Sequence, residues 1–156
     1  DDMPISRSDV NTYLVQYAET LTSQDAEAAA ALWSTPGMIA DDHFSRVLES
    51  REAMADGLRQ SYPLYEQLGP ASVRHELRDV QQLSGRLALI DVRWLFLDED
   101  ERFLIDTNSY YLLRDDNEGL RASVCIETDA VVKLRGLAES RGVNLETFDG
   151  MAKEDA

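Results

Sequence analysis

Two polar side chains stand inside a predicted β-strand, a position that both residue types disfavour. Asp106 and Asn108 belong to the strand-like run 103–113 and share one of its faces, because side chains alternate along a strand. Such a pair fits either a solvated outer surface or the polar wall of a pocket, and the sequence leaves both open. In a pocket, a carboxylate of this kind could serve acid–base chemistry.

Asp41 and Tyr17 are further candidates, and each has a simpler structural explanation. Asp41 belongs to the triplet Asp41-Asp42-His43 between two short predicted strands, and such polar triplets are usually solvated turns. Tyr17 continues the apolar stripe of a predicted helix, which favours a core tyrosine with one satisfied hydroxyl. His43 and His75 fit the surface or the edge of a core better than catalysis.

Several other chemistries lack the motifs that they require. The sequence contains no G-x-S-x-G nucleophile turn, no glycine-rich phosphate loop and no G-x-G-x-x-G fingerprint. The single cysteine, Cys125, excludes an internal disulfide, and the two histidines do not form an H-E-x-x-H pair. We therefore expect no metal site and no cofactor.

The composition describes one acidic globular domain. The chain has 156 residues, 44% of them hydrophobic, and its 30 acidic and 15 basic residues give a net charge of -15. This length suits a single core. The charge argues against nucleic-acid or anionic-membrane partners, because both require a local excess of Lys and Arg. No apolar run is long enough to cross a membrane and no signal peptide is visible, so we expect a cytoplasmic protein.

Three helices are predicted in the N-terminal half. Ser6 and Asp9 form a capping box for the first helix, while Asp25 and Ser50 can cap the second and third. Pro63 should kink the third helix, because proline lacks the N–H group and crowds the preceding turn. The predicted helices span residues 7–21, 26–32 and 51–68.

Strands dominate the remainder of the chain. Two short strands are predicted at 38–40 and 45–49, and four longer ones, joined by hairpin turns, at 73–83, 87–97, 103–113 and 120–128. One face of strand 87–97 is wholly apolar, while the other mixes leucines with Asp91 and Arg93. The apolar face should pack against helices, and the mixed face predicts a homodimer through the sheet. A short helix at 131–139 and a polar, frayed end complete the chain.

The order of these elements resembles the nuclear transport factor 2-like (NTF2-like) superfamily, which includes ketosteroid isomerase and the SnoaL-like polyketide cyclases. The resemblance rests on residues 17–25, 31–33 and 38–41, where a helix ends in a polar turn and an aspartate, followed by a Leu-Trp pair and a strand leading into acidic residues. It implies an α+β, cystatin-like fold, in which a curved, mixed or antiparallel sheet forms a cone around three N-terminal helices. The implied domain covers residues 1–129, with a C-terminal extension at 130–156.

Within this window the spacing looks like that of ketosteroid isomerase. Tyr17 precedes Asp25 by the interval at which the isomerase carries its oxyanion-hole tyrosine, and Asp41 follows Trp33 by the interval that leads to its general-base aspartate. The resemblance therefore implies Asp41 as the base and Tyr17 as the hydrogen-bond donor. Asp106 or Asn108, near the strand that carries a third catalytic residue in the isomerase, would support them.

The implied ligand is a small apolar molecule held in the cone. The reaction would be an isomerisation, cyclisation or dehydration that uses an aspartate base in a hydrophobic pocket; the alternative is a non-catalytic binding or protein-interaction module on the same fold. An enzyme requires at least one pocket carboxylate that faces apolar walls and therefore has a raised pKa. Seven further residues are expected to line the pocket: Tyr13, Trp33, His43, Tyr62, Tyr65, Trp94 and Tyr110.

Overall fold

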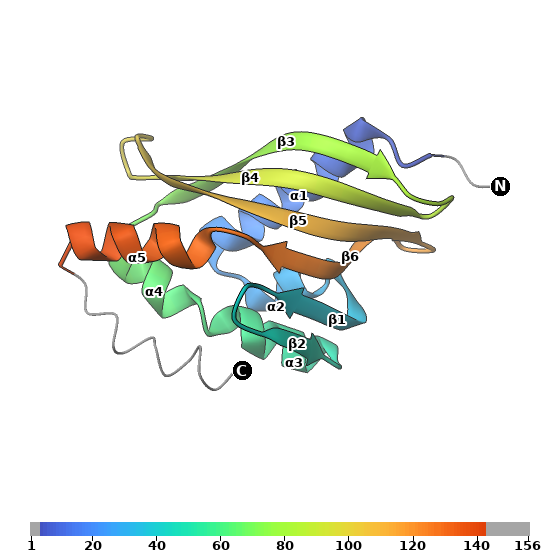
Figure 1. The fold of residues 1–156 in the computed structure, drawn as a ribbon, viewed down its shortest axis with the longest axis horizontal. Coiled ribbons are helices and arrows are strands. Elements are labelled where there is room, and N and C mark those ends of the chain that lie inside the picture. The colour runs from blue at the N-terminus through green and yellow to red at the C-terminus, as the bar shows by residue number, and fades with distance from the viewer. Residues whose placement is uncertain (1–3, 143–156) are drawn as a thin grey trace.

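The computed structural model describes residues 4–142, and the frayed end predicted after the last helix lies outside this range. Within this range two helices precede the first strand, two lie between the second and third strands, and a fifth follows the last strand (Figure 1). Their bounds are α1 (Arg7–Ser23), α2 (Ala26–Ala30), α3 (Arg51–Arg59), α4 (Tyr62–Leu68) and α5 (Ala130–Ser140). The described residues include no helix that is long and apolar enough to cross a membrane.

Helix α1 begins where its sequence predicts and ends at Ser23, two residues beyond the predicted end at residue 21. The Ser6 hydroxyl oxygen accepts a hydrogen bond from the Asp9 amide at 3.0 Å, and Gln24 ends the helix in the left-handed conformation. The apolar stripe of α1, which includes Tyr13 and Tyr17, is buried against the sheet. This packing holds both phenols inside the domain.

The predicted third helix is two helices, α3 and α4. Pro63 lies in the first turn of α4, where the missing N–H group has no intrahelical partner to lose. Ser50 caps α3 by accepting a hydrogen bond from the Ala53 amide at 3.0 Å. The chain therefore breaks before the proline instead of bending at it.

Among the described residues, six strands form one mixed sheet in the order β2-β1-β6-β5-β4-β3. Neighbouring strands are antiparallel except β1 and β6, which run parallel. The strands are β1 (Trp33–Ala40), β2 (Ser45–Leu48), β3 (Ser72–Gln82), β4 (Leu87–Leu97), β5 (Phe103–Asp116) and β6 (Gly119–Glu127). This architecture confirms the α+β class and the mixed sheet predicted from the sequence.

Alternation along the central strands separates an inner from an outer face of the sheet. Alternate residues of β4 from Ala88 to Phe96 are buried, and their neighbours on the other face are partly exposed. The inner face packs against α1, and α5 follows the end of β6 and lies beside β5 (Figure 1). Leu134 and Leu137 of α5 pack against the core, and Ala138 is fully buried. The core therefore lies between the inner face of the sheet and the helices.

Candidate functional site

A cavity of about 250 Å³ lies between the inner face of the sheet and helices α1, α3 and α4. Five polar residues from four different elements or loops line it: Arg46, Ser61, Thr107, Cys125 and Glu127. Seven aromatic side chains also line it, and we call them the aromatic wall: Tyr17, Trp33, Phe44, Tyr65, Trp94, Phe96 and Tyr111. A cavity with apolar walls and a few polar groups suits a small, largely apolar ligand.

Two tryptophan–tyrosine pairs organise the aromatic wall. The Trp33 Nε1–H donates to the Tyr17 hydroxyl oxygen at 3.0 Å, and the Trp94 Nε1–H donates to the Tyr111 hydroxyl oxygen at 3.1 Å. The ring centroids of Tyr17 and Tyr111 are 5.9 Å apart. Because an indole is a donor only, each phenol oxygen acts as the acceptor, and neither phenolic proton is used in these two bonds. Burial raises the pKa of both phenols well above their usual range, so both remain neutral donors.

Glu127 places a carboxyl group on this aromatic wall. In the register of β5 and β6, Cys125 lies opposite Tyr111 and Glu127 lies opposite the fully buried Ser109, so Cys125 and Glu127 both face inward. The Ser109 hydroxyl donates to the Glu127 Oε2 at 2.8 Å, and the Cys125 thiol donates to its Oε1 at 3.3 Å. The two hydrogen bonds fix the orientation of the carboxyl group.

The pKa of Glu127 is raised. Burial is the largest cause, and the hydrogen bonds from Ser109 and Cys125 oppose it in part. The negative charges of Asp129 and Asp41 add to the rise. A carboxyl group in an apolar site with a raised pKa is suited to proton transfer closer to neutral pH.

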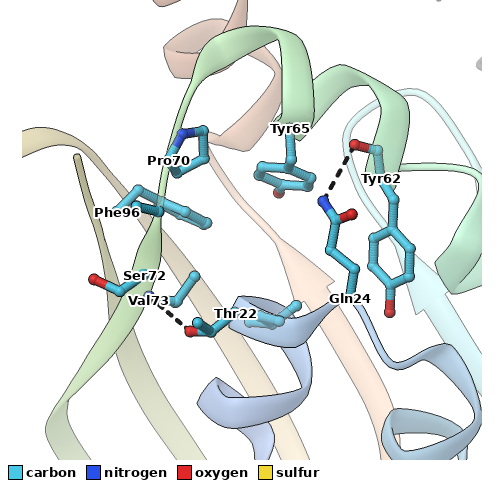
Figure 2. A pocket seen from close by; sticks show the side chains of 10 residues that line it. Thr22, Gln24, Tyr62, Tyr65, Pro70, Ser72, Val73 and Phe96 are labelled. Atoms are coloured by element: carbon cyan, nitrogen blue, oxygen red, sulfur yellow. Dashed lines mark hydrogen bonds between the residues drawn. The ribbon is translucent and has the colours of Figure 1, made fainter. Parts of the chain in front are cut away.

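The structure brings four of the predicted site residues to the cavity: Tyr17, Trp33, Tyr65 and Trp94. Two other predicted tyrosines lie elsewhere in the core. The Tyr13 hydroxyl donates to the Leu32 carbonyl oxygen at 2.7 Å, and Tyr62 lines a separate, smaller hollow beside α4 (Figure 2). Neither is among the residues that line the larger cavity.

Asp41 and His43 lie in the turn between β1 and β2. The Asp41 Oδ1 accepts hydrogen bonds from the backbone amides of His43 at 2.7 Å and Phe44 at 3.1 Å. His43 is exposed, and neither Asp41 nor His43 lines the cavity, although Phe44 does. The geometry of Asp41 is that of a turn-stabilising carboxylate, and a catalytic role for it remains a prediction.

Asp106, Asn108 and Tyr110 occupy the outer face of β5, so the structure does not bring them to the cavity. They alternate with the buried, inward-facing Thr107 and Ser109. Of the two alternatives open for Asp106 and Asn108, the structure therefore shows the outer surface.

Each of these two outer residues has a structural task. The Asp106 carboxylate accepts hydrogen bonds from Arg93 at 2.7 Å and from Lys133 of α5 at 2.6 Å. The Asn108 side chain donates to the Asp91 Oδ1 at 2.8 Å, and its backbone amide donates to the Asp129 Oδ1, also at 2.8 Å. Together these contacts attach the beginning of α5 to the sheet.

Sequence reasoning missed Glu127 and Tyr111. The signal for Glu127 is its place two residues after Cys125, on the same face of the predicted strand 120–128. That signal becomes informative only when the register between the last two strands is known, because the register decides which face is buried.

The fold and the cavity together define a domain of the cystatin-like, NTF2-like type. Residues 6–130, most of the chain, match the family described as NTF2-like protein (DUF6841), and the chain belongs to this family. The match ends at the first residue of α5. No curated protein matches the chain in sequence.

Solved structures with the same fold include three bacterial proteins of low sequence identity. A domain of unknown function with a cystatin-like fold from Nostoc punctiforme is 15% identical, with a TM-score of 0.62 and coverage of 96% of this chain and 95% of that one. An NTF2-like protein of unknown function from Shewanella oneidensis is 15% identical, with a TM-score of 0.62 and coverage of 78% and 98%. A ketosteroid isomerase-like protein from Erwinia carotovora is 13% identical, with a TM-score of 0.56 and coverage of 78% and 93%. These similarities establish the fold.

Proposed function

We propose that this domain binds a small, largely apolar molecule in the aromatic cavity and that Glu127 exchanges a proton with it. The observation that carries the proposal is the Glu127 carboxyl group on the aromatic wall, held by Ser109 and Cys125. Glu127 meets the requirement for an enzyme on this fold, which is a pocket carboxylate with apolar surroundings and a raised pKa.

The proposed chemistry is proton transfer at a carbon atom next to an oxygen-bearing group. The Glu127 carboxylate removes the C–H proton, and the electron pair of that bond moves toward the ligand oxygen. The Tyr17 and Tyr111 hydroxyls, oriented by Trp33 and Trp94, donate hydrogen bonds to this oxygen as it gains negative charge. Return of the proton to another carbon completes an isomerisation. If the neighbouring carbon instead carries a hydroxyl group, its C–O bond breaks, the hydroxide leaves as water with the proton held by Glu127, and the result is a dehydration.

Two further considerations support a catalytic cavity. Pairing neutral phenol donors with a carboxylate in an apolar site separates the two roles that enolisation requires, a base and a donor. The same fold occurs in a ketosteroid isomerase-like protein, which makes isomerase-type chemistry a reasonable class to test first.

The test uses 5-nitrobenzisoxazole, a small flat molecule that reports on a base in an apolar pocket. A base removes its ring C–H proton, the ring N–O bond breaks, and the product is a coloured cyanophenolate whose oxygen takes the charge. We expect measurable elimination by the full chain and a loss of about 100-fold or more in Glu127→Gln, the usual size of a general-base contribution. Equal rates in the two proteins would overturn the assignment of Glu127.

Asp41→Asn is the matched control variant. The amide oxygen of asparagine can keep both backbone hydrogen bonds of the turn, so the fold should persist. If Glu127 is the base, elimination by Asp41→Asn stays within a few-fold of the wild-type rate. A loss as large as that of Glu127→Gln, with normal circular dichroism, would move the role of base to Asp41.

A further inference from the structure

Two hollows of the molecule share one wall. The cavity that contains Glu127 and a smaller hollow of about 30 Å³ beside α4 are lined in common by Leu21, Tyr65 and Phe96. Figure 2 shows Tyr65 and Phe96 among the side chains that line the smaller hollow. These side chains therefore separate the two spaces.

Beside Leu21, the wall is a stacked pair of aromatic rings. Tyr65 from α4 and Phe96 from β4 have ring centroids 5.4 Å apart and an interplanar angle of 18°. Phe96 is buried in the core, and Tyr65 packs against the core from outside. Two flat rings from different elements thus close one side of the cavity, and a rigid ligand that extends in that direction meets them.

The hollow beyond the wall is small and has polar edges. The Val73 amide donates to the Thr22 Oγ1 at 3.0 Å, and the Gln24 side-chain amide donates to the Tyr62 carbonyl oxygen at 3.5 Å, as Figure 2 shows. A space of this size holds about one water molecule or one methyl group. It becomes useful to a ligand only when it is joined to the larger cavity.

We propose that the stacked side chains of Tyr65 and Phe96 set the upper size limit of the ligand, and that the hollow behind them becomes a second apolar subsite when either ring is shortened. This proposal rests on ligand binding in the aromatic cavity, as in the proposed function. It assigns the ligand to compact, ring-containing ketones with at most a short alkyl substituent. Tyr65 and Phe96 are thus specificity-determining residues.

The experiment measures the affinity of 4-n-alkylcyclohexanones for the full chain. Both tryptophans of the chain, Trp33 and Trp94, line the cavity, so their fluorescence reports on binding. Affinity should rise about fourfold for each added CH₂ group while the chain still fits, and then fall. In Tyr65→Ala and Phe96→Ala, the longest alkyl chain that still gains affinity should be longer than in the wild type.

Leu58→Ala is the matched control, because Leu58 lines the larger cavity but not the small hollow. The optimum chain length should stay at the wild-type value in this variant. An equal shift in Leu58→Ala would mean that total cavity volume sets the limit, which overturns the proposal. An unchanged optimum in Tyr65→Ala and Phe96→Ala would overturn it as well.

Two further measurements keep the test decisive. If either alanine variant fails to fold by circular dichroism, Tyr65→Leu and Phe96→Leu keep apolar bulk while removing the stacked ring, and the same shift is expected. If the wild-type chain binds none of the ketones, ligand binding in this cavity fails and the size limit fails with it. Binding with a clear optimum but without elimination of 5-nitrobenzisoxazole would instead refute only the proton-transfer role of Glu127.

Discussion

The two faces of the sheet shift the pKa of a carboxyl group in opposite directions. Glu127 on the inner face of β6 lines the aromatic cavity, and burial raises its pKa. Asp106 on the outer face of β5 contacts Lys133 and Arg93, and hydrogen bonds from these two cations lower its pKa to about 2. One carboxyl group is thus suited to taking up and releasing a proton, and the other to remaining charged.

This difference shows that a polar residue in a strand does not by itself indicate a functional site. Asp106 attracts attention in the sequence because strand interiors disfavour aspartate, yet its task is to hold Lys133 and the beginning of α5. Glu127 lies at the end of its strand, where an acidic residue is unremarkable. Which of the two could do chemistry is decided by the face of the sheet, and therefore by strand register.

The outer face provides the test with the largest expected effect. Leu89, Leu112 and Val124 are cross-strand neighbours on this face, and Ile126 beside them is 41% exposed. We propose that this apolar band pairs with a second copy of the chain. Leu112→Asp should then weaken dimerisation about 100-fold, because it places a charge in an apolar contact.

Sedimentation equilibrium at micromolar concentration measures this effect. Leu83→Asp is the control, since Leu83 is exposed beyond the end of β3, and it should leave dimerisation unchanged. A wild-type chain that sediments as a monomer would contradict the dimer.

The pH dependence of stability distinguishes the two carboxyl groups. The expected contribution of the charged Asp106 is about 1–2 kcal/mol. The pKa of Asp106 is lower in the folded chain than in the unfolded chain, so its ion pairs stabilise the fold above about pH 4 and this contribution disappears as the pH falls toward 2. Asp106→Asn should therefore cost about 1–2 kcal/mol at pH 7, after allowance for solvent screening, and nearly as much at pH 4.

Glu127→Gln should change stability in the other direction. The pKa of Glu127 is raised on folding, so its ionisation costs stability as the pH rises through that value. The variant should be more stable than the wild type in urea at neutral pH and equal to it near pH 4. A destabilised Glu127→Gln at pH 7 would show that the carboxylate is compensated by contacts that outweigh its burial.

Much of the fold could be predicted from the sequence. Periodicity and caps such as Ser6 and Ser50 gave the helices, and hairpin spacing gave the long strands, because both signals are local. To predict the break between α3 and α4, one would have to know whether Pro63 lies inside a helix or in the first turn of a new one. Both arrangements satisfy the local chemistry of proline.

The site was predictable only in part. Tyr17, Trp33, Tyr65 and Trp94 reach the cavity because large aromatic residues on apolar faces point toward the core. The carboxyl group of the site could not be found in this way. Glu127 is known to face inward only because it pairs with the buried Ser109 on the neighbouring strand, and the sequence does not give this pairing. The alternation of side chains along a strand defines two faces, and only tertiary packing determines which face is buried.

The smallest expected effect is a difference between the two hydrogen bonds to Glu127 in how far each one shifts the pH dependence of the rate. Both Ser109 and Cys125 lower its pKa, and the Ser109 hydroxyl contributes more because it donates at 2.8 Å, whereas the Cys125 thiol is a weak donor at 3.3 Å. Ser109→Ala and Cys125→Ala should therefore each move the midpoint of the 5-nitrobenzisoxazole rate profile to higher pH, Ser109→Ala by the larger amount. At a pH below the midpoint, the rate should fall a few-fold in Ser109→Ala and less in Cys125→Ala. Identical profiles in all three proteins would mean that the group controlling the rate is not the carboxyl group that Ser109 and Cys125 contact, and the contrast between the two faces would no longer explain the chemistry.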